Sequence, residues 1–138
     1  MTASVHFPAD AAVLALADRF IEAIQTGDID TVKACYHPDV VVWLNTAGVG
    51  VDRQTNLQVL TGFVGKTSER RYQNRRVQTF PGGYVQQHLL KATHIKGPVL
   101  ELAATLVCQV QHGVIIRLDE YFDSAPLTAW YAQIKAYA

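Results

Sequence analysis

The sequence predicts an α+β fold in which a curved, cone-shaped antiparallel sheet wraps around N-terminal helices and leaves an enclosed pocket. Apolar residues follow a helical period near both ends of the chain, but a period of two from residue 69 to residue 122. The links between these later strands are short, and short links force antiparallel neighbours, because parallel strands need long crossovers. Helices segregated from antiparallel strands indicate an α+β protein, and a strongly curved sheet closed by helices encloses a cavity.

Helical patterns at the start of the chain have recognisable ends. Asp10 can cap a first helix that Gly27 terminates, and its apolar face is Val13, Leu16, Ala17, Phe20 and Ile24. Asp28 can cap a short second helix that Pro38 ends, with an apolar face of Ile29, Val32 and Tyr36. These two helices are expected to supply one layer of the core.

The remaining elements follow from the change of period. The segment 40–44 is β-branched and aromatic and predicts a strand, and a third helix is expected over 53–63. The four later strands are predicted at 69–80, 84–93, 99–110 and 114–122, separated by turns rich in Gly and Pro. Ser124 can cap a last helix whose apolar face is Leu127, Trp130, Tyr131 and Ile134.

Length and composition set the class of protein. The 138 residues predict one domain, 1–138, large enough for a core and a small pocket. Apolar residues make up 49% and charged residues 17%, which is typical of a globular chain. Twelve Lys and Arg balance twelve Asp and Glu, so charge gives no case for nucleic acid or an anionic membrane as partner.

Cysteine usage and the N-terminus predict a cytoplasmic protein. Cys35 and Cys108 both lie in apolar surroundings, and we expect them to be reduced, buried and inert. Residues 1–10 lack the charged and apolar regions of a signal peptide, and the apolar stretch 102–108 is too short to span a bilayer.

The predicted last strand carries a carboxylate in an apolar row. Alternation places five residues on one face: Val114, Ile116, Leu118, Glu120 and Phe122. A carboxylate in such a row must be paired, be protonated or face a polar cavity. Glu120 is therefore a candidate pocket residue, although a position near the strand end also allows it to reach water.

Two more candidates lie on the strand 84–93. Gln86 and His88 share a face with Tyr84, and on the inner side of the sheet they would join Glu120. An imidazole beside a carboxylate is a plausible proton-transfer pair near pH 7. The pattern equally allows a hydrogen-bonded core histidine.

Trp43 and Asn45 alternate with Val41 on one face of the first strand. The amide of Asn45 could donate to and accept from a ligand oxygen, or it could form a turn at the strand end. No metal site is expected, because His88 and His94 are too far apart along one strand to share an ion. The basic cluster Lys66, Arg70, Arg71, Arg75 and Arg76 is interpreted as a solvated edge of the sheet.

Four segments carry a family resemblance: residues 20–23, 27–30, 36–40 and 113–123. Together they resemble the SnoaL-like and ketosteroid isomerase-like branch of the nuclear transport factor 2-like superfamily, and the likeness covers nearly the whole chain. It implies the cone fold with a pocket and, as in many such proteins, a homodimer.

A distant likeness to limonene-epoxide hydrolase implies polar pocket positions. Asn45 matches that family's Asn, and Trp43 stands at its Tyr position. His88, Gln86 and Glu120 stand where its Asp-Arg-Asp set would be. The triad is therefore not retained, and the known epoxide mechanism is not expected.

The resulting hypothesis is a cofactor-free isomerase, cyclase or hydratase that acts on a small hydrophobic cyclic molecule. His88 would act as general base or acid and Glu120 would orient it, while Asn45 and Gln86 would hold substrate oxygens. The pocket walls would be Trp43, Phe20, Phe63 and Phe122. The alternative is a non-catalytic ligand-binding or protein-interaction module of the same fold.

A homodimer is also expected from the strand 99–110, which is apolar on both faces. The helices can cover only the concave face, and a large exposed apolar patch usually marks an interface. The alternative is that the last helix folds back over the convex face and leaves a monomer.

Overall fold

The computed structural model of the protein describes residues 8–137. Its four helices are α1 (Ala11–Thr26), α2 (Ile29–Cys35), α3 (Arg53–Lys66) and α4 (Ala125–Lys135). Its six strands are β1 (Tyr36–Leu44), β2 (Gly50–Val51), β3 (Thr67–Phe80), β4 (Gly83–His94), β5 (Val99–Gln111) and β6 (Val114–Phe122). The predicted α+β class is confirmed. None of these helices is long and apolar enough to cross a membrane.

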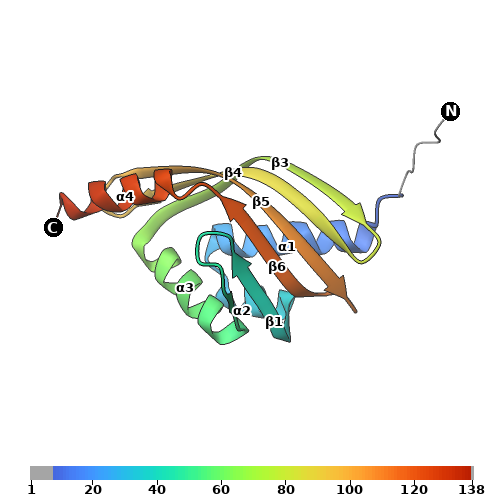
Figure 1. Cartoon of the computed structure of the whole chain (residues 1–138). Helices are drawn as coiled ribbons and strands as arrows, with labels where there is room; N and C mark the ends of the chain where they lie inside the picture. The colour runs from blue at the N-terminus through green and yellow to red at the C-terminus, as the bar shows by residue number, and fades with distance from the viewer. Residues whose placement is uncertain (1–7, 138) are drawn as a thin grey trace.

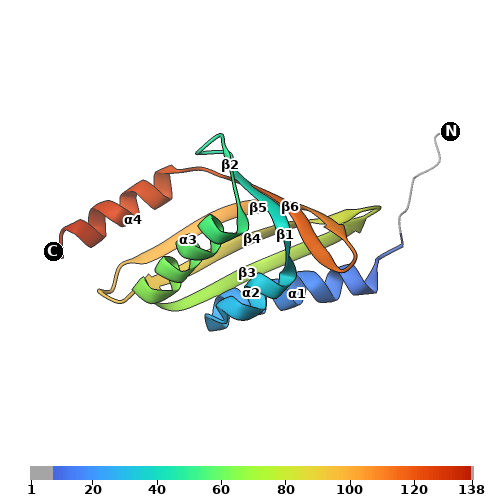
Figure 2. The same ribbon diagram turned by 90° about the horizontal axis from the view of Figure 1, so that it is seen from below.

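All six strands form one curved sheet in the order β2-β1-β6-β5-β4-β3. The four strands β3 to β6 are antiparallel neighbours, as predicted, whereas β1 runs parallel to β6. The long strands arch over α1 (Figure 1). Seen from below, α1, α2 and α3 lie on the same face of the sheet (Figure 2). The helices thus cover the concave face.

Local chemistry explains the helix ends. Asp10 accepts hydrogen bonds from the first backbone N–H groups of α1, and Asp28 accepts one from the Thr31 N–H in α2. Gly27 ends α1 with a φ of 79°, a left-handed conformation that glycine adopts without strain. Ser124 stands at the N-cap position of α4, as predicted, but its side chain makes no capping hydrogen bond, and Asp123 instead accepts from the Ala125 N–H.

The second helix is shorter than predicted. It ends at Cys35, and Tyr36 begins β1 with its side chain buried in the core. Extended backbone is favoured just before a proline, so Pro38 shifts the boundary toward the strand.

The main core lies between α1, α2 and the concave face of the sheet. Cys35 and Cys108 are both buried and free, as predicted. On β6, Leu118 and Ile115 face this core, but Ile116 does not, which corrects the predicted row. Val110 pairs with Ile115 and Gln109 with Arg117, so Ile116 is the extra residue of a bulge that reverses the alternation.

The last helix does not cover the convex face. Trp130 of α4 is buried against Leu100 and Leu102, which point to the concave side of β5. Its indole N–H donates to the Pro98 carbonyl at 3.0 Å. The alternative that α4 folds back over the outer face is therefore wrong, and in the described part of the chain no helix covers that face (Figures 1 and 2).

Candidate active site

A small cavity lies between α1, α3 and the concave face of the sheet. Its volume is about 70 Å³, room for about two water molecules at liquid density. The apolar lining is Phe20, Ile21, Ile24, Val42, Leu44, Leu60, Leu106 and Leu118. Four polar side chains complete it: Tyr36, Asn56, Tyr72 and Glu120. Such a lining suits an apolar molecule that carries one or two oxygens.

Glu120 supplies the carboxyl group of this cavity. It lies on β6 opposite Leu106 on β5 and Leu44 on β1. Within residues 8–137, no hydrogen bond or ion pair holds its carboxylate, and desolvation by the apolar neighbours raises its pKa to about 7. A carboxyl group in this state can gain and release a proton near neutral pH.

Hydroxyl and amide groups face the same space. Tyr36 donates to Asn56 Oδ1 at 2.8 Å, which leaves the amide N–H groups of Asn56 as free donors. Burial raises the pKa of both Tyr36 and Tyr72, so both phenols keep their protons. The carboxylate of Glu120 also raises the pKa of Tyr72, which places the two groups within electrostatic reach.

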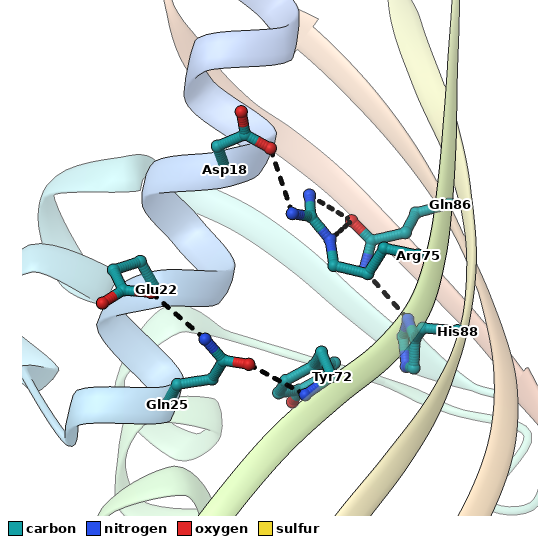
Figure 3. A network of polar contacts seen from close by, with 7 residues as sticks. All are labelled: Asp18, Glu22, Gln25, Tyr72, Arg75, Gln86 and His88. Carbon is teal, nitrogen blue, oxygen red and sulfur yellow. Dashed lines mark hydrogen bonds and ion pairs between the residues drawn. The ribbon is translucent and has the colours of Figure 1, made fainter.

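A polar network runs from α1 to β4 (Figure 3). Arg75 Nη1 donates to Asp18 at 3.0 Å, and its Nε and Nη2 donate to Gln86 Oε1 at 3.2 and 3.1 Å. The amide nitrogen of Gln86 lies 2.9 Å from His88 Nδ1. Nearby, the Gln25 side chain accepts from the Tyr72 backbone N–H.

His88 belongs to this network and does not line the cavity. Its ring packs edge-on against Tyr72, with centroids 4.7 Å apart. Burial, and then the charge of Arg75, lowers its pKa to about 4, so the imidazole is neutral at pH 7. Glu120 is not among the groups that shift the pKa of His88. The two residues share the concave side, but the structure gives them different surroundings.

The other predicted site residues are distributed over three places. Phe20 lines the cavity, and Gln86 is fully buried in the network. Phe63 and Phe122 pack instead around Trp130, in a second core cluster near α4. Neither of these two phenylalanines, which were expected to wall the pocket, lines this cavity.

Trp43 and Asn45, which were expected in the pocket, also lie away from this cavity. Trp43 packs against Tyr121 on the outer face of the sheet, at a centroid distance of 5.4 Å. Asn45 accepts from the Phe122 backbone N–H at 3.0 Å and donates to its carbonyl at 3.1 Å. The side chain of Asn45 thus prolongs the pairing of β1 with β6.

Arg75, Tyr72, Tyr36 and Asn56 were not predicted as site residues. Arg75 belongs to the basic cluster that was interpreted as a solvated edge of the sheet. The structure corrects that interpretation for Arg70 and Arg75, whose side chains point into the protein. Arg70 is buried and donates to the carbonyls of Ile24 at 2.9 Å and Gln25 at 3.1 Å, near the end of α1. The isolated aromatic Tyr72 within this basic run was the available signal.

The described residues contain no group of three or more His, Cys, Asp or Glu side chains arranged to hold a metal ion. The polar groups of the cavity are one carboxyl, two phenols and one amide. They can exchange a proton and donate hydrogen bonds to an oxygen.

Comparison with solved structures finds the same fold in several proteins. A candidate polyketide cyclase from Xanthomonas campestris matches with a TM-score of 0.74 and 19% identity, over 89% of this chain and 96% of its own. An LEH-like epoxide hydrolase from M. tuberculosis matches with a TM-score of 0.72 and 19% identity, over 91% and 93%. AclR, a candidate hydroxylase from Streptomyces galilaeus, matches with a TM-score of 0.79 and 13% identity, over 89% of this chain and 82% of its own.

At these identities the likeness concerns the fold. No curated protein matches the chain. The family model of the SnoaL-like domain matches residues 17–118, a range that begins within α1, ends within β6 and stops two residues before Glu120. The nuclear transport factor 2-like architecture expected from the sequence is confirmed, and the chain belongs to the SnoaL-like domain family.

Proposed function

We propose that the protein binds a small apolar molecule bearing a carbonyl or hydroxyl oxygen and moves a proton on it, using Glu120 and no cofactor. The observation that carries the proposal is the unpaired Glu120 carboxyl, which opens onto an apolar cavity beside Tyr72. With a pKa of about 7, this group suits proton abstraction and return at neutral pH.

The proposed step is an isomerisation or ring closure by proton transfer. Glu120 takes a proton from a carbon next to a carbonyl, and the phenol of Tyr72 donates a hydrogen bond to the developing oxyanion. The protonated Glu120 then returns the proton at another atom, so no further reactant is needed. His88 and Gln86 stay in the proposal as buried polar support, and Glu120 takes over the proton-transfer role first expected of His88.

The cavity must widen before it admits a ring-sized molecule. Its present volume of about 70 Å³ lies well below the roughly 300 Å³ at which ligand pockets begin. Helix α3 is the covering element best able to shift, because none of its residues is fully buried. Leu57 and Leu60 would then slide off the core cluster against which they pack.

The small volume of the cavity also supports the second candidate, a non-catalytic binding or interaction module. A panel of cyclic ketones, lactones and epoxides tests both, with binding and turnover followed in parallel. An enzyme should lose turnover but keep binding in Glu120→Gln, because the amide keeps the shape and loses the exchangeable proton. A binding module should bind a compound and convert none of the panel in either form.

We further propose that a second copy of this chain covers the convex face of the sheet. Val99 and Tyr121 on that face are 45% and 46% exposed, and Ala103 and Val107 continue the apolar surface along β5. A two-fold pairing of sheets is a common way to bury such a surface. The cytoplasmic location expected from the sequence stays a prediction.

A further inference from the structure

Arg75 reaches the network through an irregularity in β3. The strand shifts register between Gln73 and Arg76, and Asn74 there has a φ of 55°. This bulge turns Arg75 to the side of the sheet on which Tyr72 also lies, whereas Arg76 remains exposed. The result is a guanidinium group between Asp18 on α1 and Gln86 on β4 (Figure 3).

The guanidinium fixes the orientation of the Gln86 amide. An arginine side chain has only donors, and two of them point at Gln86 Oε1. The amide oxygen must therefore face Arg75, and the NH₂ group must face the other way. There it lies 2.9 Å from His88 Nδ1.

The amide in turn fixes the proton on His88. An NH₂ group only donates, so Nδ1 must accept and cannot carry a hydrogen. A neutral imidazole with an unprotonated Nδ1 carries its hydrogen on Nε2. We propose that Arg75 and Gln86 are positioning residues that hold His88 as the neutral Nε2–H tautomer, which makes the ring a hydrogen-bond donor next to Tyr72 rather than a base.

Neither alternative state of His88 fits this arrangement. The Nδ1–H tautomer would require the amide to turn, which would set its NH₂ group against the guanidinium and break two hydrogen bonds. The imidazolium would place a second positive charge beside Arg75. The groups facing the ring are Arg75 and Tyr72 from β3 and Gln86 from β4, while Asp18 from α1 lies behind Arg75.

This assignment has a consequence that rests on the proposed function. With His88 held as a donor, Glu120 is the one carboxyl group among the described residues that line the cavity, so turnover should follow a single ionisation. The tautomer itself is independent of catalysis and can be measured in the resting protein.

The test is nitrogen NMR of protein labelled with ¹⁵N-histidine, with His88→Asn used to assign the His88 signals. The native protein at pH 7 should show Nδ1 as an unprotonated nitrogen and Nε2 as a protonated one. A protonated Nδ1, alone or together with Nε2, would overturn the proposal.

Two variants test the positioning residues, with circular dichroism to confirm folding. Gln86→Glu supplies a carboxylate that accepts from Nδ1–H, so His88 should become protonated at Nδ1. Arg75→Met should free the amide to turn and give a mixture of tautomers, whereas the control Arg76→Met should leave the spectrum unchanged. An unchanged spectrum in Arg75→Met would remove Arg75 from the assignment. A confirmed tautomer with no turnover on any compound would retain the assignment and reject the catalytic function.

Discussion

Tyr72 packs edge-on against His88, with ring centroids 4.7 Å apart, and it also lines the cavity onto which Glu120 opens. One phenol ring thus connects the polar network of α1, β3 and β4 with the space proposed for substrate. Because His88 and Gln86 act behind this ring, the orientation of Tyr72 is the means by which the network can influence the cavity.

Tyr72→Phe should separate the two roles of this residue. The ring packing against His88 is kept, while the hydroxyl that would donate to a substrate oxygen is lost. We expect turnover to fall by roughly 100-fold, as for the loss of one oxyanion donor, with little change in melting temperature. Tyr131→Phe is the control, since Tyr131 lies on the surface of α4 and is 45% exposed. Equal effects of the two changes would contradict the role of Tyr72.

Glu120 and His88 should give opposite contributions to stability against pH. Glu120 has a folded pKa raised from 4.5 to about 7, so the folded state holds the extra proton and stability falls as pH rises between these values. His88 has a folded pKa lowered from 6.5 to about 4, so stability is lost as pH falls through that window. Each contribution is about 3 kcal/mol.

Urea unfolding from pH 4 to pH 8 can resolve the two contributions. Compared with the native protein, Glu120→Gln should become progressively more stable as pH rises from 4.5 to 7. His88→Asn should instead gain stability relative to the native protein as pH falls toward 4. The exposed Glu101, changed to Gln, is the control for loss of a carboxylate. Curves for Glu120→Gln and Glu101→Gln that run parallel would show that Glu120 titrates normally.

Trp130 should be the main anchor of α4. Its side chain is 2% exposed, packs against Phe63 and His94, and donates to the Pro98 carbonyl. Trp130→Ala should cost about 3–5 kcal/mol in the free energy of unfolding. Tyr131→Ala, on the neighbouring exposed position, should cost well under half of that. A small effect of Trp130→Ala would mean that α4 is not docked as described.

The proposed dimer predicts a mass of twice 15.2 kDa in sedimentation at micromolar protein. Val107→Glu should shift the protein to the monomer, because an unpaired carboxylate buried in an interface costs several kcal/mol. Gln58→Glu is the control, since Gln58 is an exposed polar residue of α3, on the opposite side of the sheet. A native protein that sediments as a single 15.2 kDa species would contradict the dimer.

The fold was largely predictable from the sequence because its signals are local. Asp10, Gly27 and Asp28 act at helix ends as predicted, and the period of two gave all four long antiparallel strands. Glu120 was found because one carboxylate interrupted an apolar row. The predicted facing of its neighbours on β6 was partly wrong, because the bulge at Ile116 reverses the alternation. No residue type in this segment indicates that bulge.

The candidate site was predictable only in part, because it depends on which face of each strand points inward. On β1, both faces are apolar, so the pattern could not show that Val42 and Leu44, rather than Trp43, line the cavity. On β3, the bulge at Asn74 brings Arg75 into the interior from a run of charged residues. Backbone irregularities of this kind arise from pairing between distant segments.

The most direct test of the central claim is the titration of Glu120 by NMR, with ¹³C-labelled glutamate side chains and Glu120→Gln to assign the signal. The account predicts a midpoint near 7, because desolvation in the cavity raises the pKa of this carboxyl to about that value. A midpoint near 4.5, the ordinary value for glutamate, would mean that the group is solvated, and it would contradict the proposed proton transfer.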